Sequence, residues 1–354
     1  MKGFFGISLV AILATGFAAA LLPRDAEAQE RPRNVRVQMQ SAYPSTLKGT
    51  GDNAVYTAKT ITSISGGTLD VRFFEPGALV PGGQIFDAVS SGSIDSGWAS
   101  PAFWTSKDIA FSIFSSVPFG PDAGEYLAWM KHGGGEKMMQ ALYAKYNIHS
   151  MLCNFTSPEA GGWFRKEINT IDDLKGIKMR FLGLGSNVLQ KLGVSTQLLQ
   201  ASEIFQALQL GTIDATEFST PSMDLSLGFH QVAKFYYFPG WHQQASFGDM
   251  IWNKAKWDSL TDTQRAQVTT ACDSALLNGM ASSEAAQMGA LKELQTKGVQ
   301  LKTFDSKLLD AFRVAWDEVA VEQSARSPEF KKAWDSLKEF RAGYAIWRER
   351  AYLR

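Results

Sequence analysis

The chain has 354 residues and carries 35 basic and 35 acidic side chains, so its formal charge is zero. This balance excludes the broad positive surface that non-specific nucleic-acid binding requires. With 45% hydrophobic and 20% charged residues, the composition also excludes a disordered or collagen-like chain. Because domains usually span roughly 100–200 residues, the length favours a globular protein of two domains.

The N-terminal segment, residues 1–28, has the composition of a secretory leader. Lys2 precedes an uncharged stretch at residues 3–23, and the small residues of Ala26-Glu27-Ala28 follow shortly after it. This order is typical of a signal peptide that is removed on export. The alternative is an uncleaved membrane anchor, because the stretch almost reaches membrane-spanning length. We expect residues 1–28 to be a signal peptide and the mature protein to lie outside the cytoplasmic membrane.

Strand-like and helix-like stretches alternate along the first part of the mature chain, as in an α/β protein. The sequence predicts strands at residues 35–39, 69–74, 148–153 and 177–179, and helices at residues 53–64 and 84–90.

An internal repeat is the most informative feature of the sequence. Residues 84–95 (QIFDAVSSGSID) are similar to residues 203–214 (EIFQALQLGTID), and Ser100 corresponds to Ser219. Each copy predicts a short amphipathic helix that ends at a glycine, the residue best suited to a left-handed position, and a strand follows. The repeat therefore predicts two related lobes.

The chain has only two cysteines, Cys153 and Cys272. Their neighbours indicate a strand and a helix interior, respectively. Two buried thiols and one disulfide both remain open, because the sequence does not give the Cα separation that decides between them.

Beyond Lys254 the sequence predicts long helices, with Thr261 or Asp262 as the N-cap of one of them. In the last segment, apolar side chains recur every three or four residues and define one stripe: Phe330, Trp334, Leu337, Phe340, Tyr344 and Trp347. Such a stripe packs either on the chain's own core or on a second subunit. Ser327-Pro328 offers a hinge before it.

Signatures of catalysis are few. The four histidines (His132, His149, His230, His242) have no close metal-ligand spacing, and no Gly-x-Ser-x-Gly elbow occurs. A glycine-rich turn follows Arg180, but Val188 occupies the place of the third glycine of a dinucleotide-binding motif.

Several motifs occur in an order that resembles one family. They are Gly161-Gly-Trp-Phe-Arg-Lys-Glu-Ile168, Asp172-Asp-Leu-Lys-Gly-Ile-Lys-Met-Arg180, Leu192-Gly193, residues 203–217 and Tyr236-Tyr-Phe-Pro-Gly-Trp241. Together they resemble the DctP-type extracytoplasmic solute-binding proteins of tripartite ATP-independent periplasmic (TRAP) transporters. The similarity is greatest to the branch that binds 2-oxo acids and related monocarboxylates.

This resemblance implies a two-lobed α/β periplasmic binding protein fold with crossing strands, a long connecting helix and a helical C-terminal extension. The expected segments are lobe I at residues 29–153, joined by part of the C-terminal region, and lobe II at 154–253. Connecting and returning helices follow at 254–326, and an amphipathic helix at 327–354. Some members of the branch are dimers that exchange a C-terminal helix, which favours a homodimer here.

The resemblance also assigns residues to a ligand site. Arg180 corresponds to the arginine that binds the substrate carboxylate, and its planar fork suits that role. In the oxo-acid branch a cation lies between protein and substrate. Glu217, the adjacent Phe218 through its backbone carbonyl, and Glu159 correspond to its ligands. Oxygen donors of this kind suit Na⁺ or Ca²⁺. The branch has an amide at the position of Glu159, so this site is more negative.

Aromatic residues complete the predicted site. Trp241 at a strand end is expected to wall the pocket, and His242 follows it where the branch often has another aromatic residue. From lobe I, Tyr43 and the loop expected at residues 98–104, including Phe103 and Trp104, are expected to face the cleft. The alternative for these aromatic residues is a place in the core.

Two functions are compatible with these features. The first is a non-enzymatic periplasmic protein that captures a small organic acid and delivers it to a TRAP membrane permease. The second is a secreted two-lobed hydrolase or lyase that acts on a carboxylate in the same cleft. The absence of a recognisable nucleophile or acid–base motif beside Arg180 favours the first.

Overall fold

The computed structural model of the chain describes residues 1, 3 and 34–351. The predicted signal peptide therefore lies outside the described residues, apart from Met1 and Gly3. Among the described residues, no helix combines the length and the apolar character needed to cross a membrane.

The strands, in chain order, are β1 (Val35–Ser41), β2 (Leu69–Phe74), β3 (Ser96–Ala99), β4 (Ile148–Thr156), β5 (Gly162–Phe164), β6 (Lys178–Arg180), β7 (Ser195–Gln197), β8 (Ala215–Thr216), β9 (Phe235–Phe238), β10 (Ser246–Asn253) and β11 (Gln300–Thr303). The α-helices are α1 (Gly51–Ile64), α2 (Ile85–Ser91), α3 (Ala123–His132), α4 (Gly135–Ala144), α5 (Leu184–Lys191), α6 (Ala201–Leu210), α7 (Pro221–Leu227), α8 (Lys254–Asp258), α9 (Asp262–Thr296), α10 (Ser306–Arg326) and α11 (Pro328–Ala351). The 3₁₀ helices are η1 (Gly82–Gln84), η2 (Pro101–Trp104), η3 (Ile109–Phe114), η4 (Ile171–Leu174) and η5 (Phe229–Gln231). Every strand and helix predicted from the first part of the mature chain is present, with ends shifted by a few residues.

Two sheets organise the described part of the chain. The first sheet has the strand order β2-β1-β3-β10-β4, and the second has the order β11-β9-β5-β8-β6-β7. In the first sheet β1 pairs in parallel with β2 and β3, whereas β10 is antiparallel to β3 and β4. In the second sheet β6 pairs in parallel with β7 and β8. Parallel strands need helical crossovers, which agrees with the predicted α/β class.

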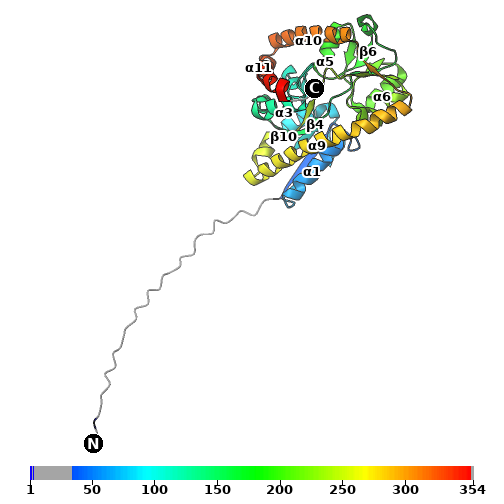
Figure 1. Cartoon of the computed structure of the whole chain (residues 1–354). Coiled ribbons are helices and arrows are strands. Elements are labelled where there is room, and N and C mark those ends of the chain that lie inside the picture. Colours follow the sequence, from blue (N-terminus) through cyan, green and yellow to red (C-terminus); the bar gives the residue numbers. More distant parts are fainter. Residues whose placement is uncertain (2, 4–33, 352–354) are drawn as a thin grey trace. The chain divides into compact units, whose positions relative to one another are not determined.

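The chain crosses between the sheets three times. It passes from β4 to β5, returns from β9 to β10, and passes again through α9 to β11. The long helix α9 contacts α1, β4 and α7, and Figure 1 shows it as the long helix coloured from yellow to orange. Thr261 caps α9 and forms a capping box with Gln264. The crossing strands and long helix implied by the resemblance are present, and the exact lobe boundaries stay a prediction.

The internal repeat forms equivalent structures in the two sheets. Helix α2 ends at Gly92 (φ 80°) and α6 ends at Gly211 (φ 73°), both in the left-handed region that favours glycine. A strand that pairs in parallel follows each helix, β3 beside β1 and β8 beside β6. The repeat therefore forms the same helix–strand unit in each sheet, with its strand at an interior position.

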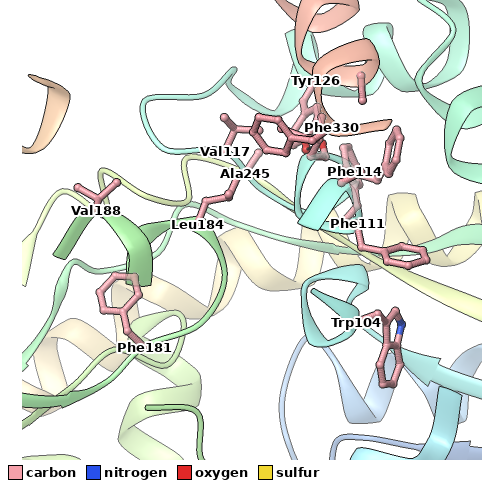
Figure 2. Packing of buried hydrophobic residues seen from close by; sticks show 14 of the residues in the cluster. Trp104, Phe111, Phe114, Val117, Tyr126, Phe181, Leu184, Val188, Ala245 and Phe330 are labelled. Carbon is pink, nitrogen blue, oxygen red and sulfur yellow. Dashed lines mark hydrogen bonds between the residues drawn. The ribbon is translucent and has the colours of Figure 1, made fainter. Parts of the chain in front are cut away.

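The C-terminal stripe packs partly on its own chain. Phe330 and Leu337 are fully buried, and α11 contacts η3, α3, α4 and α10. Figure 2 shows Phe330 among buried side chains that include Phe114 and Tyr126, in a cluster that continues to Leu184 of α5. At the far end of the stripe Trp347 remains 60% exposed. The stripe thus has a buried half and an exposed end.

The two cysteines form a disulfide. Cys153 lies in β4 and Cys272 in α9, with a Cα–Cα separation of 4.2 Å. The bridge ties the long helix to a strand of the first sheet and resolves the alternative that the sequence left open.

Candidate functional site

The candidate site lies where the carboxyl ends of parallel strands from both sheets meet. Arg180 ends β6 and Glu217 follows β8, and the Glu217 amide donates to the Arg180 carbonyl oxygen at 3.0 Å. In the first sheet, Tyr43 follows β1, and Phe103 in η2 follows β3. Ligands of open α/β sheets bind outside the carboxyl ends of the strands, so this edge is the expected place for a ligand.

A cavity of about 30 Å³ occupies this place. Its lining comes from both sheets and from the crossing segments: Tyr43, Thr50, Ser100, Phe103, Thr156, Glu159, Arg180, Leu182, Phe218, Ser219, Met223, Gln243 and Ser246. Most of the site residues predicted from the sequence are among them.

Arg180 and Glu217 form a buried ion pair inside this site. Arg180 Nη1 donates to Glu217 Oε2 at 2.9 Å and also to the Glu217 carbonyl oxygen. Arg180 Nε donates to the Leu199 carbonyl oxygen at 3.4 Å, and the guanidinium carbon lies 5.1 Å from the centre of the Phe218 ring. These contacts hold the guanidinium plane at the cavity wall.

Glu159 lies on the first crossing segment, which pairs with the second. The Glu159 amide donates to the Gln243 carbonyl oxygen, and the Gly240 amide donates to the Glu159 carbonyl oxygen. This approach needs glycine, because a Cβ at Gly240 would stand 2.2 Å from that oxygen. The Glu159 side chain accepts a hydrogen bond from Ser219 Oγ at its Oε1, 2.8 Å away. The pairing also brings His242 next to Glu159.

His242 lies between the two carboxylates. Its Nε2 is 3.5 Å from Glu159 Oε2 and 3.7 Å from Glu217 Oε1. All three side chains are buried, and among the described residues neither these two oxygens nor the His242 nitrogens have a hydrogen-bond partner. Glu159, Glu217 and His242 each offer one potential metal-ligand atom, and these atoms lie within 4.8 Å of one another.

Together, burial and neighbouring charges raise the pKa values of Glu159 and His242 and lower that of Glu217. Burial raises the pKa of Glu159 to about 8, and the nearby Glu217 charge adds to this shift. Burial would also raise the pKa of Glu217, but the Arg180 charge and His242 hold it below its ordinary value. Burial would lower the pKa of His242, yet the two carboxylates raise it to about 9. The ion pair with Arg180 therefore keeps Glu217 ionised.

Three predicted tryptophans, Trp98, Trp104 and Trp241, lie apart from the cavity lining. Trp241 is buried, with its ring 4.7 Å from that of Phe312 and 6.0 Å from that of Phe181, in the adjacent core. Trp104 is also buried and packs on Phe86. Trp98 lies within β3 and not in a loop, so its predicted place was wrong. Within the strand, Trp98 packs in a hydrophobic core, whereas Phe103, in η2 beyond the strand, reaches the cavity.

Two serines belong to the site although the sequence did not assign them to it. Ser100 and Ser219 occupy equivalent positions after the two repeats, and both line the cavity. Ser100 Oγ is 2.7 Å from Ser115 Oγ, and Ser219 positions Glu159. Their shared place in the internal repeat was the signal that could have identified them.

The arrangement can bind an anion and a cation side by side. A guanidinium at a cavity wall suits a carboxylate, to which it can donate two parallel hydrogen bonds. The unpartnered oxygens of Glu159 and Glu217 suit a metal ion, because buried polar atoms without partners are costly. The residues present therefore fit a cation at this site.

Comparison with protein families identifies similar proteins along most of the chain. The family of bacterial extracellular solute-binding proteins, family 7 (DctP), matches residues 41–326. A monocarboxylate 2-oxoacid-binding periplasmic protein of Nostoc sp. is 33% identical over 338 residues, which cover 96% of this chain and 93% of the relative.

Solved structures of TRAP solute-binding proteins have the same fold. A protein of Bordetella bronchiseptica has a TM-score of 0.88 at 33% identity, over 90% of this chain and 95% of that one. It is described as a mixed-occupancy dimer with copurified calcium and picolinate at the active site of one form and an apo site in the other. A protein of Pseudoalteromonas atlantica, with bound sodium and pyruvate, has a TM-score of 0.87 at 34% identity, over 90% of this chain and 97% of that one.

Proposed function

Because the chain belongs to the DctP family of bacterial extracellular solute-binding proteins, we propose that it captures a small monocarboxylate, of the 2-oxo acid class, in the cavity at Arg180. In this proposal the mature protein works in the periplasm without catalysing a reaction, and it delivers the acid to a TRAP membrane permease. The two sheets mark its two lobes, with the ligand between them.

The position of Arg180 is the observation that carries the proposal. Its side chain is 1% exposed, and its guanidinium forms part of the cavity wall. Among the described residues, Glu217 is the one carboxylate paired with Arg180. The guanidinium can therefore bind a second carboxylate, and a cation that accompanies the acid would offset the added negative charge. Tyr43 and Phe103, with ring centres 5.9 Å apart, supply an apolar face from the other sheet.

The relatives support the class of ligand and a role for a cation. The Nostoc relative is named for monocarboxylate 2-oxoacids, and pyruvate and picolinate in the two solved structures are both small monocarboxylates. Sodium or calcium accompanies them. In this chain Glu217, Glu159 and the Phe218 carbonyl oxygen would hold such an ion. A bound cation would offset the negative charge of the acid and orient its oxygens.

Ligand-dependent thermal unfolding over a panel of organic acids tests this proposal. A genuine ligand at 100 times its dissociation constant should stabilise the protein by about 2.7 kcal/mol, and mass spectrometry should recover it chemically unchanged. Conversion of the acid would support the competing hydrolase or lyase, and no stabilisation by any 2-oxo acid, with Na⁺ or Ca²⁺ present, would refute the proposed ligand class.

A further inference from the structure

In each of the carboxylates of Glu159 and Glu217, only one of the two oxygens accepts a hydrogen bond from the described residues. Glu159 Oε1 accepts from Ser219 Oγ, and Glu217 Oε2 accepts from Arg180 Nη1 and from the Leu182 amide. The second oxygen of each carboxylate has no partner among the described residues. These two free oxygens are the carboxylate oxygens that approach His242 Nε2. The existing hydrogen bonds therefore orient both carboxylates so that one lone oxygen of each points to the imidazole.

The distances do not describe a direct hydrogen bond. A charge-assisted contact between an imidazolium and a carboxylate brings nitrogen and oxygen to about 2.7–2.9 Å, whereas the two separations are 3.5 and 3.7 Å. Donor atoms on a tetrahedral metal with bonds of ~2.0–2.1 Å lie roughly 3.3–3.4 Å apart. The two nitrogen–oxygen separations are thus slightly larger than those between ligands of a small tetrahedral metal ion, and all three donor atoms lie within 4.8 Å of one another.

The imidazole changes which ion suits the cluster. Na⁺ and Ca²⁺ are hard cations that take oxygen ligands, and Ca²⁺ takes six to eight of them. Imidazole nitrogen is instead a preferred ligand of zinc and its transition-metal neighbours. Two carboxylates and one histidine also match the pattern of a metal site with three protein ligands, in which a water or a substrate oxygen takes the fourth position.

We propose that His242 is a metal ligand and that, with Glu159 and Glu217, it makes this pocket select a divalent transition-metal ion such as Zn²⁺ over Na⁺ or Ca²⁺. The inference deepens the proposed function, because it names the cation class of the same pocket. An oxygen of the bound acid would complete the coordination, beside the Arg180 guanidinium. His242 would thereby set the metal specificity of acid binding.

Metal titration of the chelator-treated, full-length mature protein tests this inference, with pyruvate at a fixed concentration. Calorimetry should give one Zn²⁺ per chain with an affinity at least about tenfold higher than that for Ca²⁺. Co²⁺, used as a spectroscopic probe, should produce the intense visible absorption of a four-coordinate ion. His242→Gln and His242→Phe should each weaken Zn²⁺ and Co²⁺ binding by at least about tenfold and leave Ca²⁺ binding nearly unchanged.

His230→Gln is the matched control, because His230 is partly exposed and lies in η5, away from the cluster. It should retain the Zn²⁺ affinity and the Co²⁺ spectrum. Loss of binding in this variant, or unchanged binding in folded His242 variants, would overturn the inference. If neither His242 variant folds, the Co²⁺ absorption spectrum of the unmodified protein tests the inference. An intense four-coordinate spectrum supports it, whereas a weak six-coordinate spectrum, or no Co²⁺ spectrum, contradicts it.

The two proposals fail differently. Binding of pyruvate with Na⁺ or Ca²⁺ but without preference for Zn²⁺ would leave the proposed function intact and reject the role of His242. A four-coordinate Co²⁺ site in a protein that binds no organic acid would support the role of His242 as a metal ligand and reject the proposed function.

Discussion

Arg180 and Glu217 form an ion pair in which each side chain is only 1% exposed. Removing two charges from water costs several kcal/mol, and good geometry with further hydrogen bonds must offset that cost. The Leu182 amide, the Leu199 carbonyl and the Phe218 ring supply such contacts. The protein therefore holds a charged arginine ready at the cavity before a ligand arrives.

Replacing Arg180 with lysine should weaken acid binding strongly. The variant keeps the charge but loses the planar fork, and a hydrogen bond between charged groups contributes about 1.5–3 kcal/mol, or roughly a 10- to 100-fold change in Kd. Calorimetry with the best-stabilising acid measures the change. The exposed Arg165→Lys is the control, and near-native affinity in a folded Arg180→Lys protein would remove Arg180 from the ligand site.

Acid binding should also depend on a cation through Glu217. Chelation in Na⁺-free buffer should lower the affinity for the acid by about tenfold or more. Glu217→Gln should reduce that dependence, because the amide loses the charge that attracts the ion. Glu339→Gln, at an exposed position on α11, should behave as the unmodified protein does. Equal affinity with and without metal ions would show that Glu217 serves the ligand or the fold directly.

Asp249 links stability to pH. It is fully buried in β10, Ser150 Oγ donates to its Oδ2 at 2.9 Å, and burial raises its pKa to about 7. Because its folded-state pKa exceeds the ordinary value near 4, the folded state binds more protons between about pH 4 and pH 7. Over that range Asp249 lowers the free energy of unfolding, as pH rises, by roughly 1.4 kcal/mol per pH unit.

Asp249→Asn should therefore flatten the pH dependence. Urea unfolding at about pH 5, 6 and 7 should show a smaller loss of stability with rising pH in the variant than in the unmodified protein. Asp310→Asn, at an exposed position on α10, should leave the slope unchanged. If the free energy of unfolding of Asp249→Asn changed with pH as steeply as that of the unmodified protein, Asp249 would not be the group that binds the extra proton in the folded state.

At the scale of elements, the repeated helix-turn-strand unit depends on local sequence, whereas the disulfide depends on packing between distant segments. Each repeat unit is specified locally, by an amphipathic helix and a glycine at its end. The disulfide instead depends on α9 packing across β4, because it joins residues 119 positions apart. A covalent link over so long a loop removes much of the freedom of the unfolded chain.

Loss of the disulfide should lower the free energy of unfolding by about 2–4 kcal/mol. Chemical denaturation of the Cys153→Ala/Cys272→Ala variant, and of the unmodified protein under reducing conditions, measures this loss. The reduced protein is the sharper comparison, because its side chains are unchanged. Unaltered stability, with both thiols shown to be free by alkylation, would contradict a stabilising role for the bridge.

At the scale of the whole molecule, α11 has one face on its own chain and an exposed end. Glu125, buried at 1% exposure, holds the helix through Arg341 and Arg348, at 3.3 and 3.1 Å. Between these two arginines, Ile346 and Trp347 are 64% and 60% exposed. Removing the whole helix would uncover the core around Phe330, so the exposed end is the better place to test association.

We expect the protein to be a homodimer that uses this exposed end. Light scattering at tens of micromolar, of the order at which specific interfaces are occupied, should give a dimer for the mature protein and a monomer for Ile346→Lys/Trp347→Glu. Leu277→Lys, at an equally exposed apolar position on α9, should remain dimeric. A monodisperse monomer of the unmodified protein would refute the dimer, and a dimeric double variant would place its interface elsewhere.

The sequence by itself determined the class of fold and the two related lobes, because these depend on local periodicity, on a repeat and on ordered motifs. The role of Arg180 as the carboxylate-binding residue stays a prediction from the resemblance. Only the tertiary structure decided which half of the C-terminal stripe is buried, that Cys153 and Cys272 meet, and that Trp98 belongs to the core. It also placed His242 between two carboxylates from separate segments. Each of these outcomes depends on contacts between residues far apart in the chain, where the packing of whole elements sets distances that no local pattern contains.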